Sequence, residues 1–193
     1  MTLYQQHRRK GSIVVFSAFL MVALFGMLAF ALDLGYVYVA RCQIQRSADS
    51  AAMAAAWELI DESVRLGIEN PSVAENNARA AAAEFAGYNQ ILSGQPGLAQ
   101  DDVQIGYLAD PSDPTEQLNT TSANLPNAVQ VRVQQTSGQN GEVRLMFGGL
   151  MGVDSTETDG IATAAFVNNF VGFGTPADGS NQGFLPFAFD LDT

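Results

Sequence analysis

The sequence contains few of the side chains on which most enzyme chemistry depends. Its 193 residues include one cysteine (Cys42), one histidine (His7) and one lysine (Lys10). A single cysteine excludes an internal disulfide and a cysteine-based zinc cluster. Because no histidine or lysine follows residue 10, the rest of the chain has no His-assisted nucleophile, His-ligated metal, Schiff-base lysine or P-loop lysine. The composition therefore predicts a protein that is not an enzyme and has no cofactor, no metal and no evident small-molecule substrate.

Basic residues are also scarce, and they are unevenly distributed. Nine Lys and Arg stand against 20 Asp and Glu, which gives a net charge of −11. Arg8, Arg9 and Lys10 lie in a tail without acidic residues, so the remaining chain holds six basic residues against 20 acidic ones. A segment this acidic is repelled by nucleic acid and by anionic lipid, and we expect no nucleic-acid partner. With 47% hydrophobic residues the chain is too apolar to be disordered, and its length allows one domain plus an appendage.

A long uncharged run dominates the N-terminal region. Residues 12–32 carry no charge, and twelve of these 21 residues are Leu, Ile, Val or Phe. A helix of this length spans roughly 31 Å, close to the hydrocarbon thickness of a bilayer. A buried core helix seldom lacks a polar face over such a length. We therefore predict a transmembrane helix over residues 12–40. By the positive-inside rule, the basic tail of residues 1–11 stays in the cytoplasm and the remainder is exported.

Three features near the end of the run have alternative interpretations. Ala29-Phe30-Ala31 fits a signal-peptidase site, but the apolar run is longer than that of a usual signal sequence and apolar residues resume after Asp33, which favours an uncleaved anchor. The carboxylate of Asp33 is expected to be either solvated at the membrane interface or in polar contact with a partner helix. Cys42 is either an ordinary helix residue or the site of an intermolecular disulfide.

The helix is predicted to continue beyond the membrane, because no proline occurs before Pro71. Residues 41–66 are mostly good helix formers, and one helix over residues 12–66 would be roughly 80 Å long, ending at Gly67. The small residues of 48–56 indicate either tight helix packing or simply high helix propensity. Apolar residues at helical spacing beyond them are expected to face the core of the exported head: Trp57, Ile60, Val64 and Ile68.

The exported head, residues 41–167, is predicted to be α+β. A capping box from Ser72 to Glu75 predicts a second helix over residues 72–92, packed antiparallel to the first. Alternating apolar residues predict strands over 102–109, 128–136 and 156–167, whereas 142–151 fits either a strand or a short helix. A small antiparallel sheet laid over two helices satisfies these patterns. Residues 168–193 form a Gly/Phe-rich C-terminal extension that is either incomplete or docked on the head or a partner.

Acidic residues in the head raise two further hypotheses. Residues 109–127 are expected to form a surface loop, in which Asp110, Asp113 and Glu116 would either gather around Ca²⁺ or supply carboxylate acid–base chemistry. Their spacing matches no established calcium loop, so a solvated acidic loop is favoured. Residues 154–158 are faintly similar to the Asp-x-Ser-x-Ser metal site of von Willebrand A domains. Without the βαβ context of that site, we expect them to form a strand edge.

Several N-terminal features follow one family pattern in order. After the basic tail come Gly11 and Ser12, then the hydrophobic span, and then a set of polar and small residues: Asp33, Gly35, Arg41, Gln45, Ala48, Asp49, Ala51 and Ala52. This pattern covers a quarter of the chain and resembles the N-terminal region of TadG-like proteins of the Tad (Flp, tight-adherence) pilus assembly system. The resemblance implies a pilin-like fold and a single-pass protein of the bacterial inner membrane. It also implies that these residues pack helices together, with other pilus-assembly membrane proteins or pseudopilins as partners.

The same resemblance makes Gly11–Ser12 a candidate processing site. Pilins cut by prepilin peptidase are cleaved after a glycine and carry a glutamate five residues later. Here Phe16 occupies the position of that glutamate. This departure argues against processing and against the behaviour of a major pilin, and it fits the TadG-like branch better than the TadE-like pseudopilins.

The function predicted from the sequence is therefore structural. We expect a non-enzymatic, membrane-anchored assembly component of a Tad (Flp) type IV pilus system that supports pilus biogenesis or surface adhesion. The alternative is a membrane-tethered extracytoplasmic binding or adhesion module unrelated to a pilus. A carboxylate-dependent exported hydrolase is disfavoured by the missing histidine and lysine.

Overall fold

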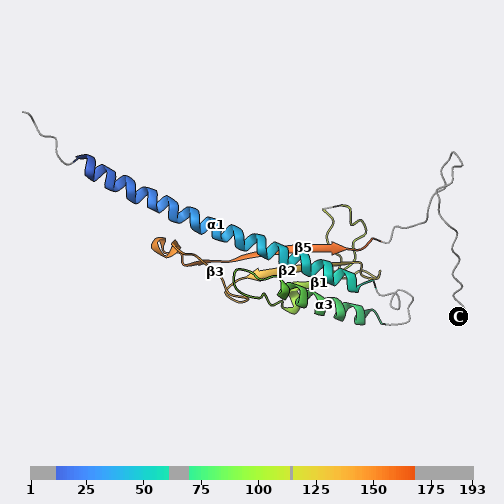
Figure 1. The fold of residues 1–193 in the computed structure, drawn as a ribbon. Coiled ribbons are helices and arrows are strands. Elements are labelled where there is room, and N and C mark those ends of the chain that lie inside the picture. Colours follow the sequence, from blue (N-terminus) through green and yellow to red (C-terminus); the bar gives the residue numbers. More distant parts are fainter. Residues whose placement is uncertain (1–11, 61–69, 114, 168–193) are drawn as a thin grey trace, which may run out of the picture.

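The computed structural model describes residues 12–60, 70–113 and 115–167. Figure 1 shows a long helix whose C-terminal half carries a small α+β head, while its N-terminal half extends away from the head. The predicted α+β architecture is confirmed. In chain order the elements are α1 (Ser12–Glu58), α3 (Pro71–Tyr88), the 3₁₀ turn η1 (Gln100–Asp102), β1 (Val103–Gly106), β2 (Ala128–Gln135), β3 (Val143–Arg144), the 3₁₀ turn η2 (Gly148–Met151), β4 (Ser155–Thr156) and β5 (Thr158–Ala165).

Helix α1 is continuous over 47 residues. The prediction that it runs to Leu66 is wrong, because its last turn tightens at Glu58. The backbone N–H groups of Leu59 and Ile60 bond to carbonyls three residues earlier, and Leu59 turns into the core. Gly67, Val64 and Ile68 lie outside the described residues.

The prediction that Trp57 and Ile60 face the core is also wrong. Trp57 is 73% exposed and Ile60 is exposed as well. In this part of α1 the buried residues recur at a spacing of three or four, as expected for one face of a helix. Most of them are alanines, and the last is a leucine: Ala48, Ala51, Ala52, Ala55 and Leu59. Trp57 lies away from this face and beside the exposed Met53, so the alanines rather than the larger residues determine which side of the helix is covered.

Helix α3 begins at Pro71, one residue earlier than predicted. Asn70 is the N-cap, its side chain accepts the N–H of Ser72 at 3.0 Å, and Pro71 occupies the first helical position. Proline suits that position because its fixed φ is helical and its missing N–H would have no helical partner. The proposed cap at Ser72 is therefore wrong. The helix ends at Tyr88 rather than at residue 92, where the side-chain amide of Asn89 donates to the carbonyl of Phe85.

The two helices pack antiparallel through small residues. Every fourth residue of α3 is a buried alanine, namely Ala74, Ala78, Ala82 and Ala86. At one end of the contact the buried hydroxyl of Ser47 donates to the carbonyl of Ala86 at 3.1 Å, and at the other end Leu59 and Ala74 line the same cavity. Small side chains allow the two backbones to approach closely, so the alanine block forms a tight helix contact within this chain.

A three-stranded antiparallel sheet in the order β1-β2-β5 packs against α1 through β2 and β5. Val131 of β2 pairs with Val103 of β1 and with Ala162 of β5. The alternating residues Val129, Val131 and Val133 are fully buried and join Ile44 in the core. The predicted strands are thus confirmed, with shorter bounds.

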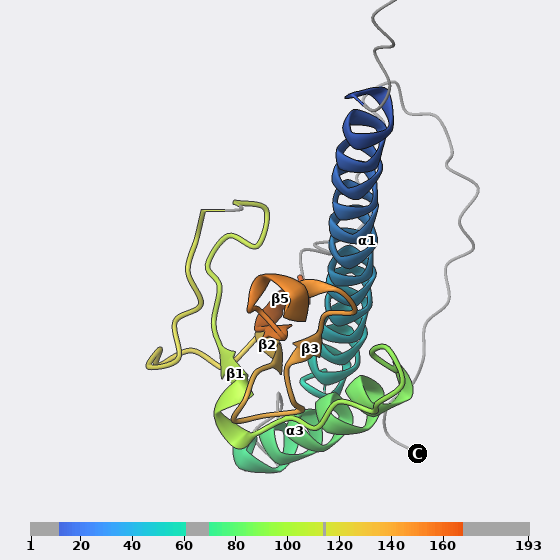
Figure 2. The ribbon, with the colours of Figure 1, turned by 90° about the vertical axis from the view of Figure 1, so that its left-hand side faces the viewer.

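The ambiguous segment 142–151 forms both a strand and a short helix. Strand β3 pairs with β4 as a narrow ribbon, and η2 lies in the connection between them. Figures 1 and 2 show this ribbon leaving the sheet and running back along α1 toward its N-terminal half. Residues 145–153, which form the far end of the ribbon, are called the hairpin tip below.

Candidate functional site along the long helix

The family-pattern residues of α1 fall into three groups in the structure. Asp33, Arg41 and Gln45 contact the strands and the hairpin, as described below, and Asp49 accepts a hydrogen bond from Gln45. Ala48, Ala51 and Ala52 are buried against α3 and the sheet. Gly35 is exposed, and a Cβ atom built on it would meet nothing within 4 Å. Ser12 begins α1, whereas Arg8, Arg9, Lys10 and Gly11 lie outside the described residues.

Asp33 holds the hairpin tip against α1. Its side chain is only 7% exposed. Oδ1 accepts the backbone N–H of Met146 at 2.8 Å, and both carboxylate oxygens lie 3.1 Å from the backbone nitrogen of Phe147. Hydrogen bonds to an ionised acceptor are stronger than those between neutral groups. Neither expectation from the sequence describes this residue, because its carboxylate is bound within the chain.

Two longer polar side chains fasten α1 to strand β5. The guanidinium Nε of Arg41 donates to the hydroxyl of Thr158 at 3.3 Å. The amide of Gln45 donates to Oδ1 of Asp49 at 2.9 Å and to the carbonyl of Ile161 at 3.1 Å. The last bond uses a backbone group of β5, so the polar residues of the pattern set the position of the strand along the helix.

Gly160 is a packing residue that was not singled out from the sequence. A Cβ atom at this position would lie 2.8 Å from Cγ2 of Ile44 and 3.3 Å from the backbone nitrogen of Gln45. Strand β5 therefore crosses α1 at a distance that only glycine allows. A glycine inside a β pattern often marks such a close approach, and this signal was available in the sequence.

An apolar groove of about 930 Å³ runs between α1 and the hairpin tip. On the helix side it is lined by residues from Gly26 to Arg41, including Phe30 and Tyr38. The tip contributes Phe147, Leu150 and Met151. The carboxylate of Asp33 lies at the edge of this groove. Its oxygens already accept hydrogen bonds from backbone N–H groups of the hairpin tip. The groove can receive apolar groups but offers no arrangement for acid–base chemistry.

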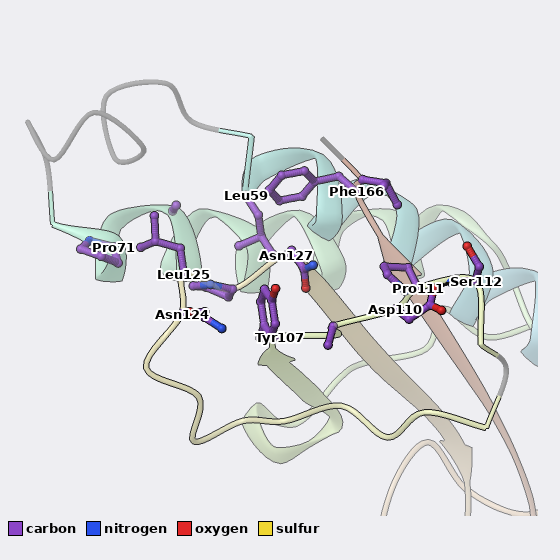
Figure 3. Close-up of a pocket in the computed structure, with 14 residues that line it drawn as sticks. Leu59, Pro71, Tyr107, Asp110, Pro111, Ser112, Asn124, Leu125, Asn127 and Phe166 are labelled. Atoms are coloured by element: carbon purple, nitrogen blue, oxygen red, sulfur yellow. Dashed lines mark hydrogen bonds between the residues drawn. The ribbon is translucent and has the colours of Figure 1, made fainter. Parts of the chain in front are cut away.

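A second cavity, of about 450 Å³, lies in the head where α1 ends and α3 begins (Figure 3). Leu59, Tyr107 and Leu125 are among the residues that line it. Its carboxylate, Asp110, accepts the backbone N–H of Ser112 at 2.9 Å. Both ends of the Asn127 side-chain amide are bonded to the backbone of Leu108. The polar groups of this cavity thus stabilise the surrounding loops.

The acidic loop residues do not gather into one site. Asp113 accepts both the N–H and the hydroxyl of Thr115, and these bonds lower the pKa of the Asp113 carboxyl. Glu116 instead accepts the N–H groups of Ala109 and Asp110. Across residues 12–60, 70–113 and 115–167, no three His, Cys, Asp or Glu side chains are arranged to hold a metal ion. The carboxylates serve as caps of turns in the surface loop.

Residues 154–158 form the predicted strand edge. The hydroxyl of Ser155 donates to Glu142 across the ribbon. Glu157 accepts the N–H and the hydroxyl of Ser137, each at 2.9 Å. These two donors lower the pKa of the Glu157 carboxyl because they stabilise its charged form. The acidic residues here join β4 to the turn that follows β2.

The N-terminal half of α1 has the properties of a membrane-crossing helix. Within Ile13–Glu58 an 18-residue window has a mean hydropathy of 2.6, and none of that window is buried. It is the one such helix among the described residues. Cys42 is an exposed free cysteine beyond this window.

Two protein-family models match the chain and together cover residues 11–164. Residues 11–58 match a family described as "Putative Flp pilus-assembly TadE/G-like". Residues 54–164, more than half of the chain, match one described as "Putative Tad-like Flp pilus-assembly". The first match coincides with α1, and the second covers α3, the sheet and the hairpin tip. No curated protein and no solved structure shows a significant match.

Proposed function

Because the chain belongs to the Tad family of Flp pilus-assembly proteins, we propose that it is a single-pass membrane subunit with a mechanical role in the pilus machine. The observation that carries this proposal is the division of α1. One half is apolar on all sides and uncovered, and the other half is the central helix of the head. Because the helix is continuous, the head is held at a fixed position relative to the membrane-spanning half, with no flexible linker between them.

The proposed orientation places the N-terminus in the cytoplasm of a bacterial inner membrane. Arg8, Arg9 and Lys10 precede the apolar run, and the positive-inside rule retains such residues on the cytoplasmic side. The head is then extracytoplasmic. We also propose that the apolar run stays attached, since α1 continues through Ala31 and Asp33 is bonded to the head.

The proposed role is non-enzymatic. Asp110, Asp113 and Glu116 of the head accept backbone N–H groups of their own loop, and no histidine or lysine follows residue 10 to activate a nucleophile. The small face of α1 is already covered by α3, so contacts with other pilus-assembly proteins would use surfaces that remain exposed. The family membership favours this role over a tethered adhesion module unrelated to a pilus.

Gene deletion and complementation test the proposal. Deletion in a piliated native strain is expected to abolish Flp pili and surface attachment, and the intact gene should restore both. Val22→Arg, which places a charge in the apolar run, should fail to restore them, because a charged residue at the middle of a membrane helix costs about 2.5–3.5 kcal/mol. Thr120→Arg, an equal change at an exposed site in the head, should restore them. Normal pili and attachment in the deletion strain would contradict the proposal.

A further inference from the structure

The hairpin tip is an uncharged apolar segment that projects from the head. Residues 145–153 carry no charge, and they are bounded by the exposed Arg144 and Asp154. Leu150 is 86% exposed, Met151 73% and Met146 70%. Large apolar side chains that protrude together in this way are unusual on a surface that faces water.

The tip lies at a defined level along α1. The groove beneath the tip is lined on the helix side by residues from Gly26 to Arg41. Within this range, Asp33 is hydrogen-bonded to the backbone of the tip. Gly26 is seven residues before Asp33, which corresponds to about 10 Å of helix. If the uncharged run ending at Leu32 marks the edge of the hydrocarbon, η2 reaches into the outer leaflet.

The backbone of the tip is suited to a region with little water. A non-helical segment within a membrane must find partners for its own polar groups. Six N–H groups of the tip are hydrogen-bonded within the chain: Leu145, Met146, Phe147, Leu150, Gly152 and Val153. Two of these bonds end on Asp33, so the tip also supplies the donors that a carboxylate needs at this depth.

Glycines make this compact turn possible. A Cβ atom on Gly148 would overlap the carbonyl oxygen of Val153, and one on Gly149 would lie 2.7 Å from Oδ1 of Asp154. Gly152 has a φ of +82°, a conformation that favours glycine. The three glycines close the turn tightly and direct the large apolar side chains outward.

We propose that the hairpin tip inserts into the outer leaflet of the bilayer that α1 spans, with lipid acyl chains as its binding partner. This inference rests on the proposed membrane anchor. Its support is the continuity of the exposed tip with the uncovered apolar surface of α1, together with the charged residues at both ends of the tip. Two attachments to one bilayer fix the rotation of the head about the axis of α1, which a single helix leaves free.

Fluorescence quenching by lipid tests this directly. In a Cys42→Ser chain, the single substitutions Leu150→Cys, Val22→Cys and Thr120→Cys are each labelled with an environment-sensitive dye. The full chain is then reconstituted in phosphatidylethanolamine/phosphatidylglycerol vesicles containing acyl-brominated lipid. We expect the dyes at positions 150 and 22 to lose most of their fluorescence relative to vesicles without bromine. The dye at position 120, in the head loop, should be unaffected.

The other outcomes separate the two proposals. Quenching at position 22 without quenching at 150 would overturn the insertion of the tip and leave the anchor standing. No quenching at either position would overturn both. A blue-shifted but unquenched signal at 150 that grows with protein density would show that a second copy of the chain covers the tip, and would also overturn lipid insertion.

Discussion

Oδ1 of Asp33 accepts a hydrogen bond of 2.8 Å from the backbone N–H of Met146, across 113 positions of sequence. This contact joins the part of α1 that directly follows the apolar run to the hairpin tip. It explains how a narrow two-stranded ribbon, which has little core of its own, keeps a fixed place on α1. The apolar groove, the glycine turn and the carboxylate form one structural unit.

Removing the carboxylate should release the tip. For Asp33→Ala we expect the protection of the Met146 and Phe147 amides against hydrogen exchange to fall roughly 30-fold. This corresponds to about 2 kcal/mol, the typical contribution of hydrogen bonds to a charged group. Hydrogen exchange of the full chain in lipid nanodiscs measures this. Amides of β2 should keep their protection.

Asp154→Ala is the matched control, because the exposed Asp154 side chain accepts no bond from these amides. Equal loss of protection in both variants would mean that the tip is not held by Asp33.

The alanine contact between α1 and α3 should not tolerate a larger side chain. Ala82 is fully buried, and Ala82→Leu is expected to destabilise the chain by about 1–3 kcal/mol, because overpacking forces the helices apart. The adjacent Ala83 is exposed, and Ala83→Leu should change stability by less than about 0.5 kcal/mol. Thermal unfolding in mild detergent, followed by circular dichroism, compares the two. Equal midpoints would contradict the packing described.

Gly160→Ala should separate β5 from α1. The added methyl group would meet Ile44 at 2.8 Å, so we expect a loss of about 1–3 kcal/mol and a midpoint lower by several degrees. Gly138→Ala is the control, because its Cβ would meet nothing within 4 Å. If the two variants unfold at the same temperature, the close crossing of β5 and α1 is refuted.

The link between Glu157 and Ser137 predicts a pH dependence. The pKa of Glu157 is lowered in the folded chain, so the unfolded chain binds more protons and stability rises with pH in this range. The stability that this link contributes is fully present above the ordinary glutamate pKa, roughly 4.3. It is lost as the pH falls through the lower pKa that Glu157 has in the folded chain.

Ser137→Ala removes the hydroxyl donor and should raise the pKa of Glu157 toward its ordinary value. Carboxyl carbon shifts followed by NMR during an acid titration measure this. The Asp113 carboxyl, whose pKa is lowered by Thr115 elsewhere in the head, should titrate unchanged. An unchanged Glu157 titration in the variant would refute the role of Ser137.

Much of the fold follows from local patterns in the sequence. The uncharged run predicted the exposed half of α1, and the strict alternation of Val129, Val131 and Val133 predicted the central strand. The start of α3 was also encoded locally, in Asn70-Pro71, but the capping box at Ser72 was a competing signal. The end of α1 at Glu58 has no local signal, since good helix formers continue beyond it.

The site along α1 could be predicted only in part. The polar residues of the helix were identified from the family pattern, but their partners lie more than a hundred positions away and no local pattern reveals such contacts. The hairpin tip was ambiguous because its apolar residues have neither helical nor strand spacing. Its glycines and the charged residues at its ends were the signals that could have indicated a projecting turn.

The central claim is that α1 crosses the bilayer and carries the head to the outside, and Cys42 tests it most directly. This exposed residue lies nine positions beyond Asp33 on the head side of the apolar run. In intact spheroplasts, a membrane-impermeant maleimide should label Cys42 without permeabilisation, while Gln5→Cys in a Cys42→Ser chain should react only after permeabilisation. Labelling of position 5 from outside with Cys42 protected, or recovery of the full chain in the soluble fraction, would contradict the account.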